Sequence, residues 1–278
     1  MLPQDGHVHT EWSWDAPHGS MEQACARAVH LGLPSVVFTD HADFTEWRVS
    51  DGVAAFFHDL GQETADGVFV PPALDLDGYL ACLERCRARF TDLRVVSGVE
   101  LGEPHLHPER AADLLGRGGF DLVVAALHSL PDGDGGHVEV SDAYLRRSRR
   151  DVVRTYLTEV GRMIAAWDEF DVLAHVDYAA RAWPAGERPY RAVDFETEYR
   201  AVLHALAGTG RALEVNTRLG VDPLIVNWWK QEGGTAVSFG SDVHDPHFLA
   251  QGFADAVEVV ATNGYRHGPH LGGLWTLH

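Results

Sequence analysis

The chain has 278 residues and is 45% hydrophobic, so it is long and apolar enough to bury the core of a single α/β barrel. Its 41 acidic and 22 basic residues give a formal net charge of −19, which argues against a nucleic-acid partner because such binding depends on basic contacts to phosphate. No run of about 18 apolar residues is present, so we expect no membrane span, and the opening M-L-P-Q-D-G-H lacks the basic and apolar regions of a signal peptide.

The cysteine content favours a reducing compartment. Cys25, Cys82 and Cys86 are too few, and odd in number, for a disulfide framework. Cys82 and Cys86 are spaced i,i+4 on a predicted helix, and we interpret both as core residues. With the N-terminal sequence, this predicts a cytoplasmic protein.

Strand and helix patterns alternate along the chain. Apolar runs predict strands at residues 4–9, 35–40, 94–100, 121–128, 171–175, 211–217 and 235–242. Helical patterns lie at residues 20–31, 76–90, 108–117, 142–167, 194–208, 222–232 and 249–263. Repeated strand-then-helix units predict an α/β fold, with a parallel sheet closed into a barrel, as one domain over 1–278. The alternative is an open doubly wound sheet, which gathers its ligands at one switch point.

One segment interrupts this alternation. Residues 43–75 are too many for an ordinary connection between a strand and a helix. The segment leaves the carboxyl end of the second strand, so it is expected to lie over a site at that end of the barrel. Two interpretations remain open, namely a lid that shapes the substrate pocket and an insertion that packs on the rim.

Side chains that bind metals stand at the ends of the predicted strands, where such barrels carry their catalytic groups. His7 and His9 are spaced i,i+2 on the first strand, so both imidazoles point the same way and suit one ion. Six of the seven predicted strands end in or run into such a side chain, which favours a closed ring. Imidazole and carboxylate donors suit Zn, Mn or Fe. The nine candidate ligands are His7, His9, His18, His41, Glu100, His128, His175, Asp242 and His244.

The order of these motifs resembles that of the polymerase and histidinol phosphatase (PHP) family of metallophosphoesterases. The matching segments are D-G-H-V-H-T with the following A-P-H-G, F-T-D-H-A-D, G-V-E-L-G-E, A-L-H-S-L, L-A-H-V-D, L-E-V-N-T and F-G-S-D-V-H. The resemblance covers nearly the whole chain, and the segment after the last motif is similar to the closing helix of the histidinol-phosphatase branch. One departure is Val176, which stands where the family often has proline.

The resemblance implies a distorted (β/α)7 barrel that holds three divalent metal ions, with Glu100 bridging the first two. The implied ligand sets are His7, His9, Glu100 and Asp242 for the first ion, Glu100, His128 and His175 for the second, and His18, His41 and His244 for the third. All nine positions carry the expected residue types, which favours an active enzyme over a degenerate member of the family.

The predicted activity is that of a metal-dependent phosphomonoesterase. Two close cations lower the pKa of a bridging water and supply hydroxide for in-line attack on phosphorus. We assign Glu100, Asp242 and His244 as catalytic residues. Arg181 and Arg218 follow motif-bearing strands and are expected to bind the phosphate of a small substrate. The resemblance to the histidinol-phosphatase branch implies histidinol phosphate, from histidine biosynthesis, as the substrate, and acidic residues at the rim would suit its imidazole and amine.

Other functions are compatible with the sequence. A phosphoesterase of the same family could act on another small phosphate ester, a nucleotide or a cyclic diester. A metal-stabilised module without turnover is disfavoured, because no ligand position is lost. An amidohydrolase on a similar barrel would usually need a lysine that bridges the ions, and Lys230, the only lysine, lies on a predicted helix.

Overall fold

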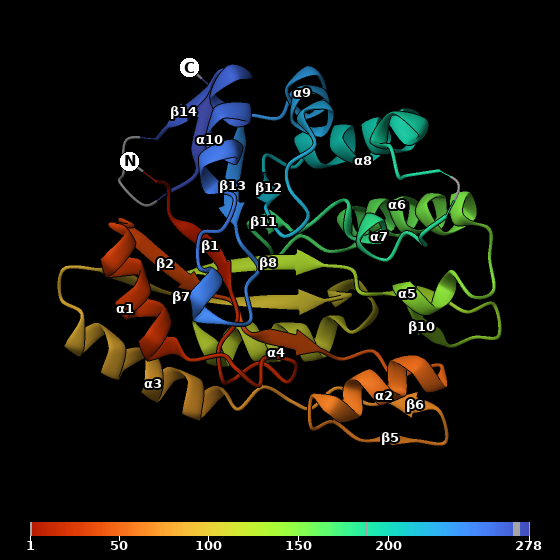
Figure 1. Cartoon of the computed structure of the whole chain (residues 1–278), viewed down its shortest axis with the longest axis horizontal. Helices are drawn as coiled ribbons and strands as arrows, with labels where there is room; N and C mark the ends of the chain where they lie inside the picture. Colours follow the sequence, from red (N-terminus) through yellow and green to blue (C-terminus); the bar gives the residue numbers. More distant parts are fainter. Residues whose placement is uncertain (1, 187, 269–272, 278) are drawn as a thin grey trace.

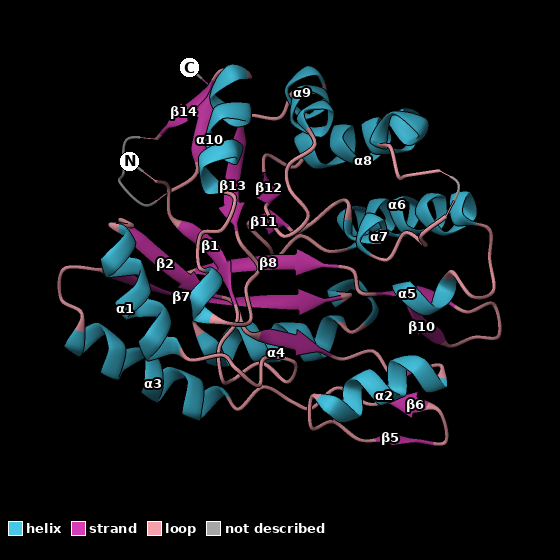
Figure 2. Cartoon of the chain, viewed as in Figure 1, coloured by secondary structure: helices cyan, strands magenta, loops and turns pink. Residues whose placement is uncertain are grey.

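The computed structural model describes residues 2–186, 188–268 and 273–277. Parallel strands follow one another around a curled sheet in the order of the chain (Figures 1 and 2). They are β1 (Asp5–Val8), β2 (Ser35–Phe38), β7 (Arg94–Gly102), β8 (Leu122–Ala126), β11 (Val172–Leu173), β12 (Ala212–Asn216) and β13 (Ala236–Gly240). The predicted single-domain α/β barrel is therefore confirmed, and the strands lie at or near their predicted positions.

The first and last of these strands are joined by backbone hydrogen bonds at their carboxyl ends. Val8 forms a parallel bridge with Val243, and the amide of Asp242 donates to the carbonyl of His7 (2.8 Å). Nearer the start of β13, its free edge pairs instead with the antiparallel strand β15 (Trp275–Leu277). The barrel is distorted for this reason, and its closed end is the end where the predicted ligands lie.

Helices cover the outside of the barrel (Figure 1). The helix expected at residues 142–167 is two helices, because the side chain of Ser148 caps a new start by accepting from the amide of Asp151 (3.2 Å). The helices around the barrel are α1 (Met21–Leu31), α3 (Leu76–Arg89), α4 (Pro108–Gly118), α5 (Val140–Ala143), α6 (Arg149–Ala166), α7 (Tyr178–Arg181), α8 (Glu196–Ala207), α9 (Pro223–Gln231) and α10 (Phe253–Thr262). Short 3₁₀ turns lie at η1 (Pro104–Leu106), η2 (Ala192–Phe195) and η3 (Pro246–Phe248), and β14 (Tyr265–His267) pairs with β15.

A second, smaller sheet is built largely from the segment that interrupts the alternation. Its strand order is β5-β6-β4-β10-β9, so strands from two distant parts of the chain pair in it. Trp47, Phe57 and Phe69 form its own hydrophobic cluster. Its strands are β4 (Trp47–Arg48), β5 (Thr64–Ala65), β6 (Val68–Phe69), β9 (Ser129–Pro131) and β10 (His137–Glu139), and helix α2 (Asp51–Asp59) lies between β4 and β5 in the chain. The preceding strand β3 (His41–Asp43) pairs with β7 of the barrel sheet. Residues 43–75 are thus a folded unit rather than an irregular loop.

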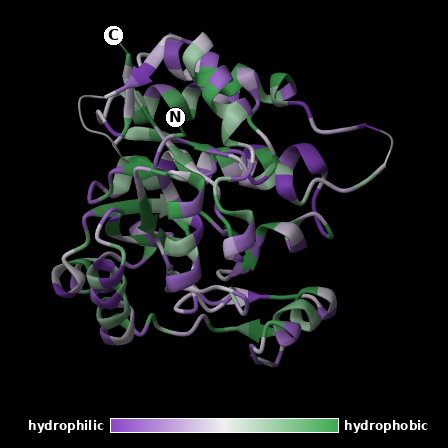
Figure 3. Ribbon diagram, turned by 60° about the vertical axis from the view of Figure 1, so that its left-hand side comes forward, coloured by the Kyte–Doolittle hydropathy of each residue, from purple (hydrophilic) through white to green (hydrophobic). Residues whose placement is uncertain are grey.

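The main core lies between the barrel strands and the surrounding helices. Figure 3 shows the hydrophobic residues gathered along the central strands. Cys25, Cys82 and Cys86 are buried there, as predicted, and carry free thiols. In the described part of the chain, every helix is too short or too polar to cross a membrane.

Candidate metal centre

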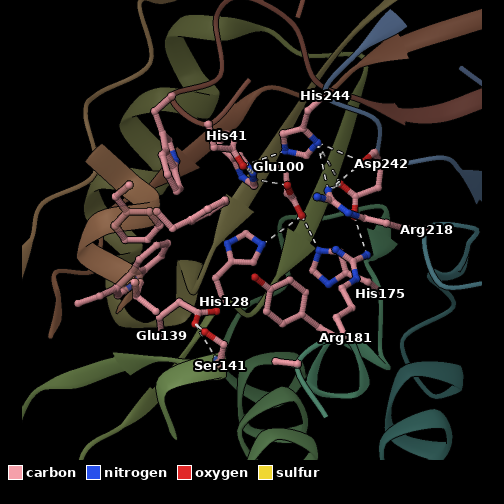
Figure 4. Close-up of a pocket in the computed structure, with 18 of the residues that line it drawn as sticks. His41, Glu100, His128, Glu139, Ser141, His175, Arg181, Arg218, Asp242 and His244 are labelled. Atoms are coloured by element: carbon pink, nitrogen blue, oxygen red, sulfur yellow. Dashed lines mark hydrogen bonds and ion pairs between the residues drawn. The ribbon is translucent and has the colours of Figure 1, made fainter. Parts of the chain in front are cut away.

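A cavity of about 370 Å³ opens at the carboxyl ends of the barrel strands (Figure 4). Ionisable side chains from the barrel form one part of its wall, and aromatic side chains from α2 and β4 form another. Donor atoms of eight of the nine predicted ligands gather here in overlapping groups. The acidic, arginine and histidine residues that line the cavity itself are Asp15, His41, Glu100, Glu139, His128, His175, Arg181, Arg218, Asp242 and His244.

Glu100 lies at the centre of this group, on β7, and is fully buried. Its Oε1 lies 2.8 Å from Nε2 of His175 and 3.4 Å from Nε2 of His128. Its Oε2 faces the other way, 3.0 Å from Nδ1 of His41 and 3.3 Å from Nε2 of His7. The two carboxylate oxygens therefore serve two different sets of imidazoles.

His7 and His9 point their Nε2 atoms at one another across 3.0 Å. Both Nε2 atoms approach Asp242 Oδ1, at 3.8 and 3.3 Å respectively. The outer nitrogens are held by the protein, because Nδ1 of His7 lies 2.6 Å from Oε1 of Glu214 and Nδ1 of His9 lies 2.9 Å from Oγ of Ser13. Partners of this kind fix the orientation of metal-binding imidazoles, leaving the inner nitrogens free to bind.

A further group contains Asp15 where the resemblance implied His18. Asp15 Oδ2 lies 2.8 Å from Nε2 of His244 and 3.3 Å from Nε2 of His41. His18 is exposed and belongs to none of the donor groups among the described residues. The placement of His18 at the site is therefore corrected to Asp15. Both residues follow His9 in one loop, and successive turns from Thr10 to Gly19 bring only the aspartate inward.

The imidazole of His128 is held by a carboxylate that the sequence reasoning did not single out. Nδ1 of His128 lies 2.9 Å from Oδ1 of Asp43, whose Oδ2 accepts a hydrogen bond from the indole of Trp14 (2.9 Å). Gly102 makes room for this pair, since a Cβ there would overlap Asp43 Oδ1. A signal was available, because Asp43 stands two residues after His41 in the motif T-D-H-A-D and so points to the same side of an extended strand.

Glu214 is the second carboxylate that was missed, although its motif L-E-V-N-T was recognised. In addition to holding His7, it accepts a hydrogen bond from the amide of His175 through Oε2 (2.7 Å). A Cβ at Gly240 would overlap Glu214 Oε1, so glycine is required on the neighbouring strand. Glu214 thus links two barrel strands and positions one candidate ligand from each.

Opposing effects set the charge states of these buried groups. Burial raises the pKa of Glu100, but nearby imidazoles, His7 above all, hold it well below its usual range. Burial lowers the pKa of His7, yet Glu214 and Glu100 raise it well above normal. Burial and then repulsion from His244 hold the pKa of His9 well below normal. Glu100 is therefore ionised, and His9 is a neutral imidazole with a lone pair available for coordination.

Asp242 lies between the imidazoles and two arginines. Its backbone takes a left-handed conformation (φ 53°), which is unusual for a residue other than glycine. Its Oδ2 lies 2.5 Å from Nη2 of Arg181, and its Oδ1 lies 3.4 Å from Nη1 of Arg218. The side chain of Arg181 is 16% exposed and that of Arg218 is 44% exposed. The structure therefore brings both predicted arginines to the cavity wall.

Divalent cations fit this arrangement of donors. Among the described residues, the buried atoms without a hydrogen-bond partner include Glu100 Oε2 and His41 Nδ1, and such atoms are costly unless a ligand engages them. Sets of three or four donor atoms lie within 4.8 Å of one another. Their nitrogen and oxygen chemistry suits Zn, Mn or Fe. The sets are His9, Asp15, His41 and His244; His7, His9 and Asp242; His41, Asp43 and His128; and Glu100, His128 and His175.

A distorted parallel barrel with histidine and carboxylate groups at its strand ends is the architecture that the sequence motifs implied, and comparison with known families agrees. A model of the PHP domain family matches residues 5–218, and the chain belongs to this family. The histidinol-phosphatase of Lactococcus lactis is 26% identical over 256 residues, which cover 88% of this chain and 85% of that protein. The probable histidinol-phosphatase of Deinococcus radiodurans is 26% identical over 94% of both chains.

Solved structures agree with the fold. The crystal structure of histidinol phosphate phosphatase from Lactococcus lactis, complexed with zinc, L-histidinol and phosphate, matches with a TM-score of 0.80 over 95% of both chains, at 21% identity. The putative histidinol phosphatase of Listeria monocytogenes matches with a TM-score of 0.70 over 91% of this chain and 99% of the other, at 19% identity.

Proposed function

We propose that this chain is a metal-dependent phosphomonoesterase that hydrolyses L-histidinol phosphate to L-histidinol and phosphate. The observation that carries the proposal is the position of Glu100, whose two oxygens face separate sets of imidazoles beside a cavity with two arginines. Membership of the PHP domain family supports the chemistry, and relatives named as histidinol-phosphatases support the substrate. This activity would place the chain in histidine biosynthesis, in the cytoplasm.

Three divalent ions, Zn, Mn or Fe, are the proposed cofactors. When bound, such ions lower the pKa of a coordinated water and neutralise phosphoryl oxygens. Glu100 is proposed to bridge the first two, and Asp15 replaces His18 in the third set. The proposed ligands are His7, His9, Glu100 and Asp242 for one ion, Glu100, His128 and His175 for the next, and Asp15, His41 and His244 for the last.

The remaining groups hold the substrate in place. Arg181 and Arg218 flank Asp242 at the cavity wall, where their guanidinium groups are proposed to bind non-bridging phosphate oxygens. This arrangement offsets the long-range repulsion that a chain of net charge −19 exerts on a phosphate dianion. Asp242 and His244 complete the proposed catalytic set with Glu100, because all three line the cavity.

Residues 43–75 are proposed to act as a lid. The segment contributes Trp47, Gly52, Val53, Phe56 and Phe57 to the cavity wall, so its position determines the size of the opening. Apolar side chains that cover a reaction site exclude water from it, which strengthens the electrostatic interactions within.

The proposed activity is tested by measuring phosphate release from a panel of phosphate esters with metal-loaded protein. The panel contains histidinol phosphate, p-nitrophenyl phosphate, a nucleoside monophosphate and a cyclic dinucleotide. We expect histidinol phosphate to give the highest kcat/KM. A preference for the nucleotide or the cyclic diester would favour the alternative, a PHP phosphoesterase with a different substrate. Elemental analysis of protein purified without chelator should show more than one metal ion per chain.

A further inference from the structure

The cavity has a second charged end that the phosphate chemistry does not use. Figure 4 shows Glu139 and Ser141 on the opposite side of the cavity from Arg218 and Asp242. Glu139 ends β10, a strand of the smaller sheet, and its side chain is almost completely buried (9% exposed) while lining the cavity. A buried carboxylate beside a binding cavity requires a partner, because burial without one is costly.

The described residues give this carboxylate hydrogen bonds but no counter-charge. Oε2 of Glu139 accepts hydrogen bonds from the amide of Ser141 (2.7 Å) and from its hydroxyl. Among the described residues, the amide of Asp142 is the other donor to this carboxylate, and Glu139 forms no ion pair with arginine, lysine or histidine. Burial, and to a smaller extent the nearby charge of Asp142, raise the pKa of Glu139. A cation bound in the cavity would counter both effects.

Aromatic side chains form the walls around this end. Trp47 of β4 and Phe57 of α2 line the cavity with Tyr178 of α7. The ring of Tyr178 carries the guanidinium of Arg181 at 5.0 Å, and after burial the charge of Glu139 is the main cause that raises the pKa of its phenol. Tyr178 therefore contacts the arginine and lies near the carboxylate. Aromatic faces attract organic cations, so these walls suit the same ligand as the carboxylate.

We propose that Glu139 is a specificity-determining residue whose carboxylate binds a protonated nitrogen, either an amine or an imidazolium, of the alcohol part of the phosphate ester. The arginines hold the phosphate at one end, and Glu139 selects a cationic leaving group at the other. This proposal rests on the proposed phosphatase function, and it explains how an acidic cavity wall discriminates between phosphate esters that the metal site would treat alike.

The test compares two substrates in the Glu139→Gln variant, which keeps the side-chain shape and removes the charge. For histidinol phosphate, kcat/KM should fall roughly 10- to 100-fold, as expected for the loss of a charge-assisted contact. For p-nitrophenyl phosphate, whose leaving group has no cationic nitrogen, kcat/KM should stay within about 3-fold. Glu139→Asp, which retains the charge, should recover part of the loss. Equal losses on both substrates would overturn the proposal and assign Glu139 a structural role at the start of α5.

Glu46→Gln is the matched control, because it removes the same charge from an exposed position next to Trp47. Its kinetics should equal those of the unaltered protein with both substrates. If Glu46→Gln lowers kcat/KM for histidinol phosphate as much as Glu139→Gln does, the effect is one of general charge and the proposal fails.

Binding of L-histidinol, measured by calorimetry, separates this proposal from the proposed function. Glu139→Gln should weaken binding roughly 10-fold or more, whether or not the protein turns over histidinol phosphate. L-alaninol, which has the amine alone, and 4-imidazoleethanol, which has the ring alone, identify the nitrogen that is bound. If the protein binds L-histidinol in a way that depends on Glu139 but does not hydrolyse histidinol phosphate, only the proposed function is rejected. Binding that is absent, or equal in both proteins, would reject the role of Glu139.

Discussion

The barrel and the smaller sheet contribute opposite kinds of surface to one cavity. The barrel strands present buried ionisable groups, each held by a second group, as Glu214 holds His7 (2.6 Å). The smaller sheet presents aromatic side chains, such as Trp47 and Phe57, that contact one another with tilted rings. Metal coordination requires donor atoms that are positioned to a fraction of an ångström. An apolar wall stabilises a ligand mainly through the area that it buries. We therefore expect the barrel to determine the rate of the chemistry and the smaller sheet to determine which substrate is accepted.

The largest effect is expected at the centre of the barrel site. Glu100→Gln removes the charge that both imidazole sets share, while keeping the size of the side chain. Activity should fall by several orders of magnitude, because Glu100 is proposed to bridge two bound ions and the amide would no longer do so. The measurement is kcat with metal content, and circular dichroism verifies the fold. Turnover close to normal would show that Glu100 does not bridge two ions.

A paired substitution separates Asp15 from His18. Asp15→Asn should lower the affinity for one ion and reduce activity by roughly 10- to 100-fold, on the scale that loss of supporting groups at a metal site produces. His18→Asn should leave both unchanged, because His18 is exposed. Elemental analysis and kinetics of both variants provide the measurement. The reverse result would restore His18 as the ligand and would mean that the loop rearranges when metal binds.

The next largest effect on activity is expected from the two arginines at the cavity wall. Arg181→Ala and Arg218→Ala should each cost about 1.5–3 kcal/mol of transition-state stabilisation, or roughly 10- to 150-fold in kcat/KM. Arg181 should show the larger loss, because it is the more buried and leaves Asp242 without its nearest counter-charge. Metal content should not change. Arg117→Ala, on the surface and paired with Asp113, is the control. If both cavity variants keep normal efficiency, the ions alone bind the phosphate.

The smallest effect on the chemistry is expected from the smaller sheet. Phe57→Ala empties part of its cluster, at a cost of about 3–5 kcal/mol if the cavity does not collapse. Hydrogen exchange should then increase across residues 44–70, while the barrel keeps its metal and kcat changes only a few-fold. Phe56→Ala, at a side chain that is 58% exposed, is the control and should leave exchange unchanged. Loss of metal from Phe57→Ala would contradict the division of roles between the two regions.

Much of the fold and of the site was predictable from local patterns. Apolar runs mark the strands, and residues at a strand end share a position in space because parallel strands end at one edge of the sheet. His7, Glu100 and His175 were identified in this way, and the structure brings them together. Side chains two residues apart on a strand point to the same side of the sheet, and His7 and His9 were assigned to one ion for this reason. Such signals need no knowledge of how the rest of the chain folds.

The tertiary structure decided what local patterns could not. Asp15 and His18 lie in the same loop, and this loop is held against a distant segment, because Oγ of Ser13 accepts a hydrogen bond from the amide of His41 (2.9 Å). Likewise, β4 pairs with β10 across a long sequence separation, so the sequence did not predict that Glu139 would line the cavity. Contacts of this kind arise only when the barrel brings distant segments together, because their energies depend on neighbours that the local sequence does not contain.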